Sequence, residues 1–590
     1  MKEWLIKKLF VISKTSLVLA CLMLLFCVFF ASFVLFQKSF LIKSMPKNLF
    51  VNKPFVGQPL VAVAPHHNLV SAQRVLMWQL LSRQSQPKTI ILLSPNHFNS
   101  GDQEIITTEK IWLVKNGQET IKSNATIIDA LVKNGLAFDQ AEAFDNEHGI
   151  KNLLGEIKQF FPKSDLVPII IKDIAKPETI ARLDNFLFAR CQDCGVIASV
   201  DMSHYQPANL AEVHDIKTIR ALTNLDEKEI WQTEVDSNAS LSFLIAWAKK
   251  KNLNNFHLFN HTNSGFLAKD YDSETTTHIF GYYSDKSAGM VAQDNSATFM
   301  FAGDAMFGRF IGNAFQKNNF QDLFSNFGNR VFWGADISWL NLEGPISSKE
   351  VKQSTDPNDL SFNFSKEALE ALKYLKLTTI GLANNHTFNQ GKTGLEKTRQ
   401  LLAQASIDSF GHPELISEQT VRRYDNGKIK ISLLAINALE KISGLENLIS
   451  QEHQQGRFVI VLPHWGNEYQ IKHSAAQEKM ARAWFKAGAD LIIGSHPHVV
   501  QDAQIIDNKL VFYSLGNFVF DQRFSYDVQH GLLLAGVLEK NKIKIILLPI
   551  QNKDLKPEML RGQEKENILK RVCQNISKDC LSGVIEILRE

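Results

Sequence analysis

Short apolar runs that end in polar residues recur along the chain, and each predicts a buried strand followed by a loop. In the C-terminal half, five such runs are followed closely by histidine, asparagine, aspartate or glutamate. The expected strands are 298–302, 335–340, 378–382, 457–462 and 491–493. Because ligands gather at the carboxyl ends of strands in an open α/β sheet, we expect these polar side chains to meet at one edge.

The N-terminal half shows the same arrangement and predicts a second α/β unit. Its expected strands are 60–64, 89–93, 166–171 and 196–200, with helices over 71–83 and 178–189. Three of these strands lead into histidines, at Pro65-His66-His67, Ser94-Pro95-Asn96-His97 and Asp201-Met202-Ser203-His204. This unit is therefore expected to hold histidines of its own.

Polar and small residues at 284–297 mark the boundary between the two units. The predicted regions are 55–285 and 297–552, followed by a charged tail at 553–590. Apolar residues at helical spacing in this tail are Ile568, Val572 and Ile576. Their spacing predicts an amphipathic helix that packs on the second unit.

An uncharged apolar run from Thr15 to Gln37 is long enough to cross a bilayer and longer than the apolar core of a signal peptide. We interpret it as an uncleaved transmembrane helix within residues 1–54, which also contain a short tip and a polar spacer. Lysines lie on both sides of the run in equal number, so the charge rule does not set its orientation.

The composition is that of globular domains. At 590 residues, of which 45% are hydrophobic and 21% charged, the chain is too long for one core. The net charge of +3 gives no sign of a nucleic-acid partner. Cys191 and Cys194 have the spacing of a zinc half-site, a redox pair or a local disulfide, and Cys573 with Cys580 is another possible pair.

Two histidines follow the expected strand 491–493, in the stretch Gly494-Ser495-His496-Pro497-His498-Val499. Pro497 favours an extended backbone at His496, from which both rings could converge on one cation. The alternative is two surface histidines in a turn.

The N-terminal motifs are Ala64-Pro65-His66, Ser94-Pro95-Asn96-His97, Glu147-His148-Gly149, Ser199-Val200-Asp201-Met202-Ser203-His204 and Asn263-Ser264-Gly265. With them the region 55–285 resembles the Memo family, also named AmmeMemoRadiSam system protein B, whose fold is similar to the catalytic subunit of extradiol dioxygenases. The resemblance implies an Fe or Cu site at His66, His97 and His204, with Asp201 beside them. Some members have a metal-binding cysteine after the last motif, where this chain has none, so a packed pocket of hydrogen-bonded histidines is the alternative.

The C-terminal motifs are Gly303-Asp304, Asn341-Leu342-Glu343-Gly344-Pro345-Ile346, Ala383-Asn384-Asn385-His386, His464-Trp465-Gly466-Asn467-Glu468-Tyr469, Gly494-Ser495-His496-Pro497-His498 and Tyr513-Ser514-Leu515-Gly516-Asn517. With them the region 297–552 resembles the CapA family of capsule and poly-γ-glutamate synthesis proteins. That family is similar to calcineurin-like metallophosphoesterases, which implies an α/β sandwich with a metal site.

The resemblance implies that one or two divalent ions (Mn, Zn, Fe or Mg) are held by Asp304, Glu343, Asn385, His464, His496 and His498. Glu343 is expected to bridge the ions, and Glu468 to support a ligating histidine. His386 is the expected catalytic residue beside the scissile oxygen, and Arg309 and Lys392 are candidates to bind the substrate. Phosphoesterases usually carry a further ligating histidine where this chain has Met306.

These resemblances predict a membrane-anchored envelope protein with a cytoplasmic N-terminus and its globular part outside the cytoplasm. It would act in synthesis or export of a capsule or poly-γ-glutamate type polymer, and would bind or cleave that anionic polymer or a phosphorylated small molecule. One alternative is a non-catalytic assembly factor that binds polymer synthase subunits. Another is a metal-dependent redox role for the region 55–285.

Overall fold

The computed structural model describes residues 58–589 except 115–116, 287–294, 316–319, 427–428 and 441–442. The predicted transmembrane run 15–37 lies outside these residues. Within the described part, no helix combines the length and apolar character needed to span a membrane. We call residues 58–286 the N-terminal region and residues 295–589 the C-terminal region.

The N-terminal region is built on one nine-stranded mixed sheet in the order β10-β11-β1-β8-β2-β7-β3-β6, with β9 paired to β11. The strands are β1 (Val61–Ala64), β2 (Thr89–Pro95), β3 (Ile105–Thr107), β6 (Phe138–Asp139), β7 (Asp165–Ile171), β8 (Gly195–Ser199), β9 (His204–Gln206), β10 (Asn255–Asn263) and β11 (Thr275–Ser284). A hairpin of β4 (Trp112–Val114) and β5 (Glu119–Ile121) stands apart from this sheet. The four central strands are parallel, so their carboxyl ends lie at one edge. The four strands predicted for this region are confirmed.

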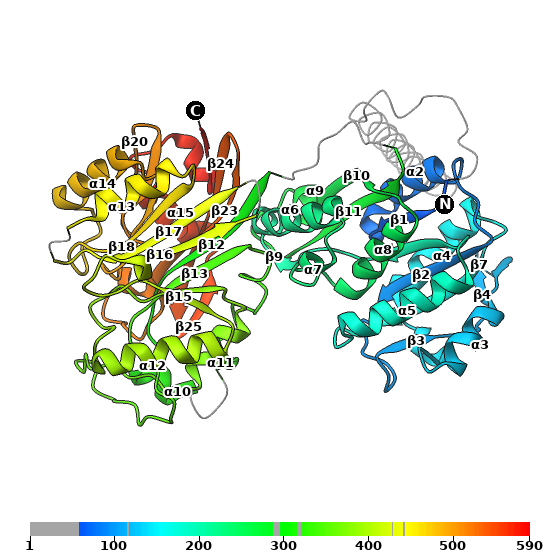
Figure 1. Cartoon of the computed structure of the whole chain (residues 1–590), viewed down its shortest axis with the longest axis horizontal. Coiled ribbons are helices and arrows are strands. Elements are labelled where there is room, and N and C mark those ends of the chain that lie inside the picture. The colour runs from blue at the N-terminus through cyan, green and yellow to red at the C-terminus, as the bar shows by residue number, and fades with distance from the viewer. Residues whose placement is uncertain are drawn as a thin grey trace, which may run out of the picture. The chain divides into compact units, whose positions relative to one another are not determined.

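Helices cover both faces of this sheet (Figure 1). They are α2 (Ser71–Leu81), α3 (Ala125–Lys133), α4 (His148–Phe160), α5 (Pro177–Arg190), α6 (Ala208–Asn224), α7 (Glu227–Ile230), α8 (Asn238–Lys250) and α9 (Ser264–Ala268). Alternate residues of β1 enter different cores: Val61 and Val63 pack with α5 and α8, while Ala62 and Ala64 pack with α2 and α4. Because side chains of a strand alternate between the two faces, a strand buried on both sides has to be apolar throughout.

The C-terminal region contains two packed sheets. One has the order β15-β14-β13-β12-β23-β24-β25, with β22 on β12 and β26 on β24, and the other has the order β16-β17-β18-β19-β21-β20. The first comprises β12 (Ser296–Ala305), β13 (Ile337–Leu342), β14 (Thr379–Gly381), β15 (Asp408–Phe410), β22 (Asn517–Val519), β23 (His530–Glu539), β24 (Lys542–Lys553), β25 (Lys556–Met559) and β26 (Val584–Leu588). The second comprises β16 (Val421–Asp425), β17 (Lys430–Asn437), β18 (Phe458–His464), β19 (Leu491–Ile493), β20 (Ala503–Ile506) and β21 (Lys509–Phe512). All five predicted strands of this region are present.

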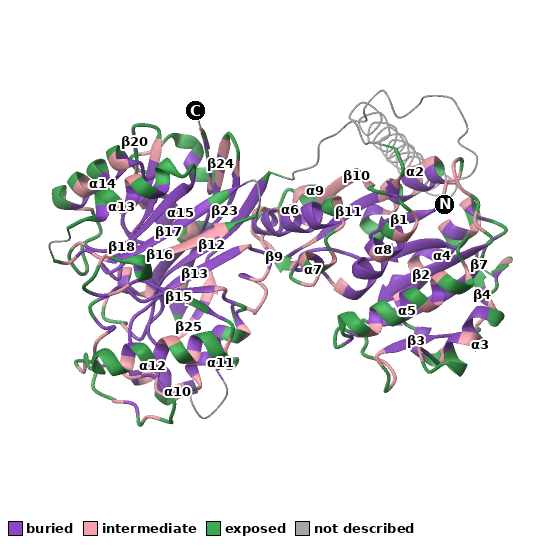
Figure 2. Ribbon diagram, in the orientation of Figure 1, coloured by how far each residue is buried: buried purple, intermediate pink, exposed green. Residues whose placement is uncertain are grey.

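One core of this region lies between the two sheets and includes Phe299 and Phe301 of β12 with Ile460 and Leu462 of β18. The outer faces are covered by α10 (Arg309–Phe315), α11 (Ala368–Tyr374), α12 (Gly391–Gln404), α13 (Leu445–Gln454) and α14 (Ala475–Ala487). Figure 2 shows the buried strands inside and the exposed outer faces of these helices. The result is the α/β sandwich that we expected for this region.

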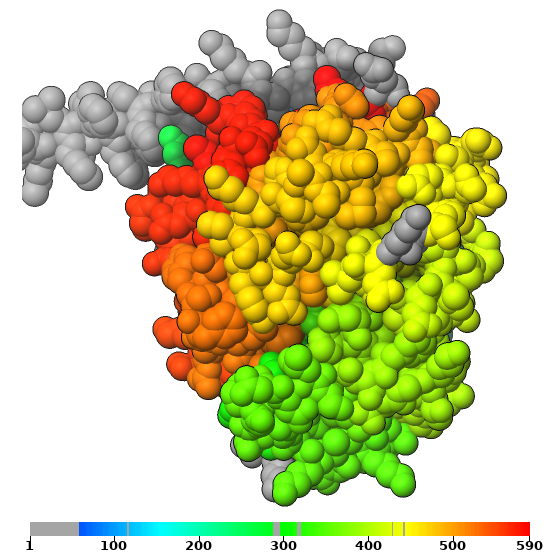
Figure 3. Space-filling view, turned by 90° about the vertical axis from the view of Figure 1, so that its left-hand side faces the viewer, coloured from blue at the N-terminus to red at the C-terminus, as the bar shows by residue number. Residues whose placement is uncertain are grey.

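The C-terminal tail forms more than the predicted helix. Ile568 and Val572 lie on α15 (Gly562–Val572) and are buried in the core between the sheets, but Ile576 follows the end of the helix. Figure 3 shows the tail, in red, beside the orange and yellow segments of this region. The last residues form β26, in which alternate residues Ile585 and Ile587 are buried, so their period of two adds a strand to β24.

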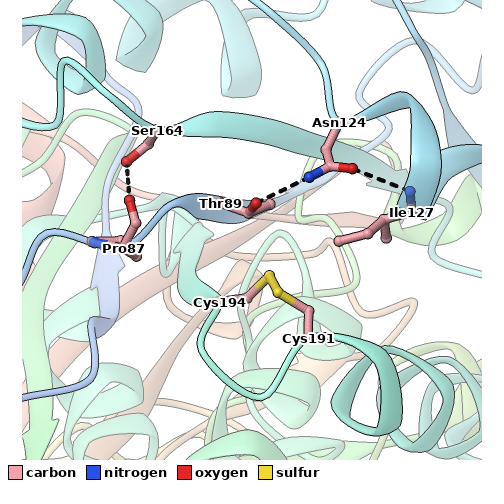
Figure 4. The surroundings of a disulfide bond; sticks show 7 residues. All are labelled: Pro87, Thr89, Asn124, Ile127, Ser164, Cys191 and Cys194. Carbon is pink, nitrogen blue, oxygen red and sulfur yellow. Dashed lines mark hydrogen bonds between the residues drawn. A yellow bond between two sulfur atoms is a disulfide. The ribbon is translucent and has the colours of Figure 1, made fainter.

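Both cysteine pairs outside the predicted anchor form disulfides. Cys191 and Cys194 are joined between the end of α5 and the start of β8, as Figure 4 shows. Cys573 and Cys580 are joined after α15. Of the alternatives for Cys191 and Cys194, the structure therefore contains the local disulfide and not a zinc half-site.

Candidate metal centres

Six predicted ligands come together where five strands of the two C-terminal sheets end. We call this set the C-terminal cluster: Asp304, Glu343, Asn385, His464, His496 and His498. β12 and β13 place the two carboxylates, the loop after β14 places the asparagine, and β18 and β19 lead into the histidines. All of them except Asn385 are buried.

One half of the cluster surrounds the Nε2 atom of His464. Asn385 Oδ1 lies 2.9 Å from this nitrogen, His496 Nδ1 lies 3.1 Å from it, and Glu343 Oε1 lies 3.8 Å from it. Amide oxygen, imidazole nitrogen and carboxylate oxygen are donors that divalent transition metals accept. We call this the first position.

The other half of the cluster surrounds His498. Asp304 Oδ2 lies 3.4 Å from its Nδ1, and the second oxygen of Glu343, Oε2, lies 3.8 Å from its Nε2. Asn517 Oδ1 contacts Nδ1 at 3.0 Å and orients the ring. We call this the second position; Glu343 stands between the two positions and offers one oxygen to each.

The charges of the cluster fit a bound cation. Burial and the neighbouring Asp304 carboxylate raise the pKa of Glu343 well above its usual value. Its Oε2 atom is buried, and no hydrogen-bond donor reaches it among the described residues. Burial and the charge of His496 lower the pKa of His464 well below its usual value, which keeps this imidazole neutral and able to bind metal.

The loop that carries the two histidines differs from our prediction at His496. We expected an extended backbone before Pro497, but His496 has a φ of 95° and His498 a φ of 57°. In this conformation the His496 N–H donates to Asp304 Oδ2 at 3.1 Å, which ties the loop to β12. Gly494 must be glycine, because a Cβ there would lie 2.1 Å from the carbonyl oxygen of Tyr513.

His386, the predicted catalytic residue, is buried beside the cluster. Its Nδ1 lies 3.0 Å from Asn389 Oδ1, and its ring packs 4.4 Å from the ring of Phe362. Burial, followed by the positive charge of His498, lowers the pKa of His386. The ring is therefore neutral near pH 7 and stands close to the second position.

The two predicted substrate-binding cations lie elsewhere. Arg309 is buried, and its guanidinium is bound to the carboxylate of Asp521 and to the carbonyl oxygen of Pro357. Lys392 is exposed at the start of α12, where its charge acts on His412. An anion clamp by Arg309 would require its ion pair to open.

Asn341 is a member of the site that we did not predict. Its Nδ2 lies 2.8 Å from Asp304 Oδ1, 3.3 Å from Glu343 Oε1 and 3.2 Å from His464 Nδ1. The sequence did mark Asn341 as a candidate, because it is a polar residue directly after the apolar part of β13. It positions three ligands of the cluster at once.

A second set of side chains gathers at the carboxyl ends of the central strands in the N-terminal region. We call it the N-terminal cluster: His66, His97, His148, Asp201 and Asp236. His66 Nε2 lies 3.3 Å from Asp201 Oδ2 and 3.5 Å from Asp236 Oδ2, and His97 Nε2 lies 3.7 Å from Asp236 Oδ2. The rings of His97 and His148 are 3.9 Å apart. Imidazole and carboxylate donors at this spacing fit Fe or Cu, and Asp236 Oδ1 has no hydrogen-bond partner among the described residues.

His204, which we predicted as a ligand, lies outside both groups of donors in this cluster. Its Nδ1 is 2.5 Å from the carbonyl oxygen of Met202. His148 and Asp236 take part instead. His148 was visible in the motif Glu147-His148-Gly149, whereas Asp236 follows no apolar strand and gave no signal in the sequence.

Glu147 holds His97 of the N-terminal cluster in place through both of its carboxylate oxygens. Its Oε1 contacts His97 Nδ1 at 2.6 Å, and its Oε2 accepts the His97 N–H at 3.0 Å. Burial opposes the charge on His97, but the carboxylates of Asp236 and Glu147 raise its pKa to about 9. Glu147 and His97 therefore form a partly buried ion pair at neutral pH.

Comparisons with known proteins agree with the division into two regions. Residues 298–522 match the family described as bacterial capsule synthesis protein PGA_cap, and residues 36–278 match the family described as Memo-like protein. The chain is 25% identical over 305 residues to the PGA biosynthesis protein CapA of Bacillus subtilis (strain 168), covering 48% of this chain and 79% of the relative. It is 27% identical over 231 residues to a MEMO1 family protein of Caldivirga maquilingensis, covering 37% of this chain and 80% of the relative.

Among solved structures, a hypothetical protein from Thermus thermophilus is 13% identical and covers 44% of this chain and 95% of its own, with a TM-score of 0.25. A score this low supports no conclusion. The two family matches, in contrast, do not overlap: the Memo-like match ends at residue 278 and the PGA_cap match begins at residue 298. The chain is a fusion of a Memo-like region with a region of the PGA_cap family of bacterial capsule synthesis proteins.

Proposed function

We propose that this protein acts in the synthesis or export of an anionic envelope polymer of the capsule or poly-γ-glutamate type. The match of residues 298–522 to capsule synthesis proteins supports this proposal, as does the similarity to a protein named for PGA biosynthesis. The metal chemistry that we propose rests on the position of Glu343. This carboxylate is buried, and its two oxygens face two separate groups of ligands.

In this proposal the C-terminal cluster is a metallophosphoesterase-like centre that binds or hydrolyses an anionic substrate. Divalent ions bound there would activate a water molecule and neutralise charge on a phosphoryl or carboxyl oxygen. Asn341 and Asn517 orient the ligands, and the neutral ring of His386 donates a hydrogen bond to the leaving oxygen. Asn385 is the exposed member of the cluster.

The proposal includes a single membrane anchor at residues 15–37, with the N-terminus in the cytoplasm and residues 58–589 outside it. The two disulfides support this placement, because structural disulfides persist in oxidising compartments outside the cytoplasm. A protease-protection assay on intact cells tests it. Cleavage of the globular part by added protease supports the placement, and protection until the cells are lysed contradicts it.

The enzymatic part is tested on the full chain in detergent. Bound metals are measured, and cleavage of a phosphodiester and of a γ-glutamyl bond is assayed with Mn²⁺. His498→Ala is expected to lose metal and activity together, whereas His453→Ala, an exposed histidine on α13, is the control that retains both. Wild-type protein without metal or turnover would favour the alternative of a non-catalytic assembly factor for a polymer synthase.

A second activity, a metal-dependent redox role, is proposed for the N-terminal cluster. The observation that favours it is the set of His66, His97 and Asp236, because two histidines and one carboxylate are the ligands of many non-haem iron sites. An iron or copper signal that is lost in His66→Ala and kept in His257→Ala, outside the cluster, is the expected result. A correctly folded wild-type sample that binds neither metal would contradict it.

A further inference from the structure

The second position of the C-terminal cluster is short of ligands. Its protein donors are Asp304, His498 and one oxygen of Glu343. Met306, two residues after Asp304, supplies none: it is buried, and its sulfur accepts the N–H of Gly308 at 2.9 Å. A cation here would need a further donor from another part of the chain.

We propose that Glu468 is that donor, as a direct ligand of the second cation; this rests on the proposed function of the C-terminal cluster as a site for divalent ions. One carboxylate oxygen of Glu468 and one ring nitrogen each of His496 and His498 all lie within 4.8 Å of one another. Donors on opposite sides of one cation stand about 4 Å apart when each bond is about 2.1 Å. Small side-chain movements therefore suffice to close the site.

The backbone holds Glu468 against the two histidines. Trp465 N–H donates to the carbonyl oxygen of Ser495 at 3.1 Å, and Tyr469 N–H donates to that of Pro497 at 2.8 Å. These bonds fix the segment on both sides of Glu468 to the loop that carries the histidines. Tyr469 has a φ of 62°, a conformation that costs energy in a tyrosine and persists because the surrounding contacts impose it.

Glu468 would also give the second position a ligand that is exposed to solvent. Asp304 and Glu343 are fully buried, whereas Glu468 is exposed. The second cation would thus be reached from solvent past Glu468.

The test uses the full chain in detergent, stripped of metal and titrated with Mn²⁺ by calorimetry and by electron paramagnetic resonance. Two ions at the C-terminal cluster of the wild-type protein give a spin-coupled signal. Glu468→Gln is expected to bind one ion as before, to bind the other at least about tenfold more weakly, and to show the six-line signal of isolated Mn²⁺. Glu446→Gln, the same change at an exposed residue of α13, is the control.

The outcomes separate this inference from the proposed function. If the wild-type protein binds two coupled ions and Glu468→Gln does the same with unchanged affinity, Glu468 is not a ligand, even if activity is lost. If the wild-type protein binds no Mn²⁺ that Asp304→Ala removes, the proposed function itself fails. Glu468→Asp, which keeps the carboxylate, is expected to recover part of the lost affinity and thereby distinguishes ligand loss from misfolding.

Discussion

The two clusters use the same kinds of side chain but balance their charges differently. In the N-terminal cluster each carboxylate faces an imidazole: Glu147 contacts His97 at 2.6 Å, and Asp201 lies 3.3 Å from His66. In the C-terminal cluster, Asp304 and Glu343 are both fully buried, and a single imidazole, His498, faces both of them, at 3.4 Å and 3.8 Å. Burial and the Asp304 carboxylate raise the pKa of Glu343, whereas His498 and His464 outweigh burial and lower the pKa of Asp304.

This difference indicates what each cluster requires. In the N-terminal cluster, protonated His97 pairs with Glu147 at 2.6 Å and offsets part of the negative charge without a metal. In the C-terminal cluster, His498 can offset the charge of only one of the two buried carboxylates that it faces, so ionisation of the second is costly unless a cation joins them. Metal binding is therefore expected to contribute more to the stability of the C-terminal region.

The largest effect is expected from removal of a carboxylate ligand. Asp304→Ala should lower the affinity for Mn²⁺ by more than about 100-fold. Loss of a residue that only supports a metal ligand typically costs about 10–100-fold, and Asp304 is itself a predicted ligand. The substitution also removes the acceptor of the His496 backbone N–H. Metal content after equilibrium dialysis measures this. Asp201→Ala serves as the counterpart, and Mn²⁺ binding at the C-terminal cluster should be unaffected by it.

Loss of an orienting residue should have a smaller effect. Asn341→Ala removes contacts to Asp304, Glu343 and His464 and should weaken Mn²⁺ binding by about 10–100-fold. Calorimetric titration gives the affinity, and Asn326→Ala, at an exposed asparagine, is the matched control. Wild-type affinity in Asn341→Ala would mean that the cluster is positioned by its backbone alone.

Replacement of one glutamate by glutamine should affect the stability of the metal-free protein differently in the two clusters. It should destabilise the protein at Glu147 but not at Glu343. Glu147→Gln breaks the ion pair with His97 and should cost about 2 kcal/mol, less than for a fully buried pair because His97 is 20% exposed. Glu343→Gln should leave the melting temperature unchanged or raise it, because a neutral amide replaces a carboxyl group whose charged form is disfavoured by burial and by Asp304. Scanning calorimetry in the presence of a chelator compares them, and equal losses in both variants would contradict the comparison.

The pH dependence sharpens this test. The pKa of His97 is raised to about 9 from an ordinary value of 6.5, so the pair with Glu147 stabilises the folded chain fully below about pH 6.5. This contribution is lost as the pH rises through 9. The difference in melting temperature between wild type and Glu147→Gln should therefore shrink between pH 7 and about pH 10, and a constant difference would show that His97 is not protonated.

The smallest effect is expected at Lys392. The side chain is exposed at the start of α12 and acts on His412, not on a member of the C-terminal cluster. Lys392→Ala should change Mn²⁺ affinity and cleavage by less than about twofold, since isolated surface charges contribute little. A larger loss of cleavage would restore Lys392 as a substrate contact.

Much of the frame of both sites could be predicted from local sequence. β19 covers the predicted residues Leu491–Ile493, and the other predicted strands differ from the observed ones only by a few residues at their ends. This works because a strand buried on both faces must be apolar throughout, and a polar residue directly after it stands at the edge of the sheet. The ligands that follow such strands were therefore visible.

The remaining parts depend on contacts between distant segments. Arg309 looked like an anion clamp, but it is bound to Asp521, 212 residues away. Asp236 lies between two helices and follows no strand, so nothing local marked it as a neighbour of His66. His204 follows β8 as predicted, yet its Nδ1 contacts the carbonyl oxygen of Met202 and it belongs to neither group of donors.

By itself the sequence determined where the strands lie and which kinds of ligand follow them, because both depend on the order of apolar and polar residues over a few positions. Only the tertiary structure decided which donors share a position: that Glu343 stands between His464 and His498, and that Glu468 approaches the second of these. Those distances follow from how two sheets pack against each other. Packing over long range is what a local pattern does not contain.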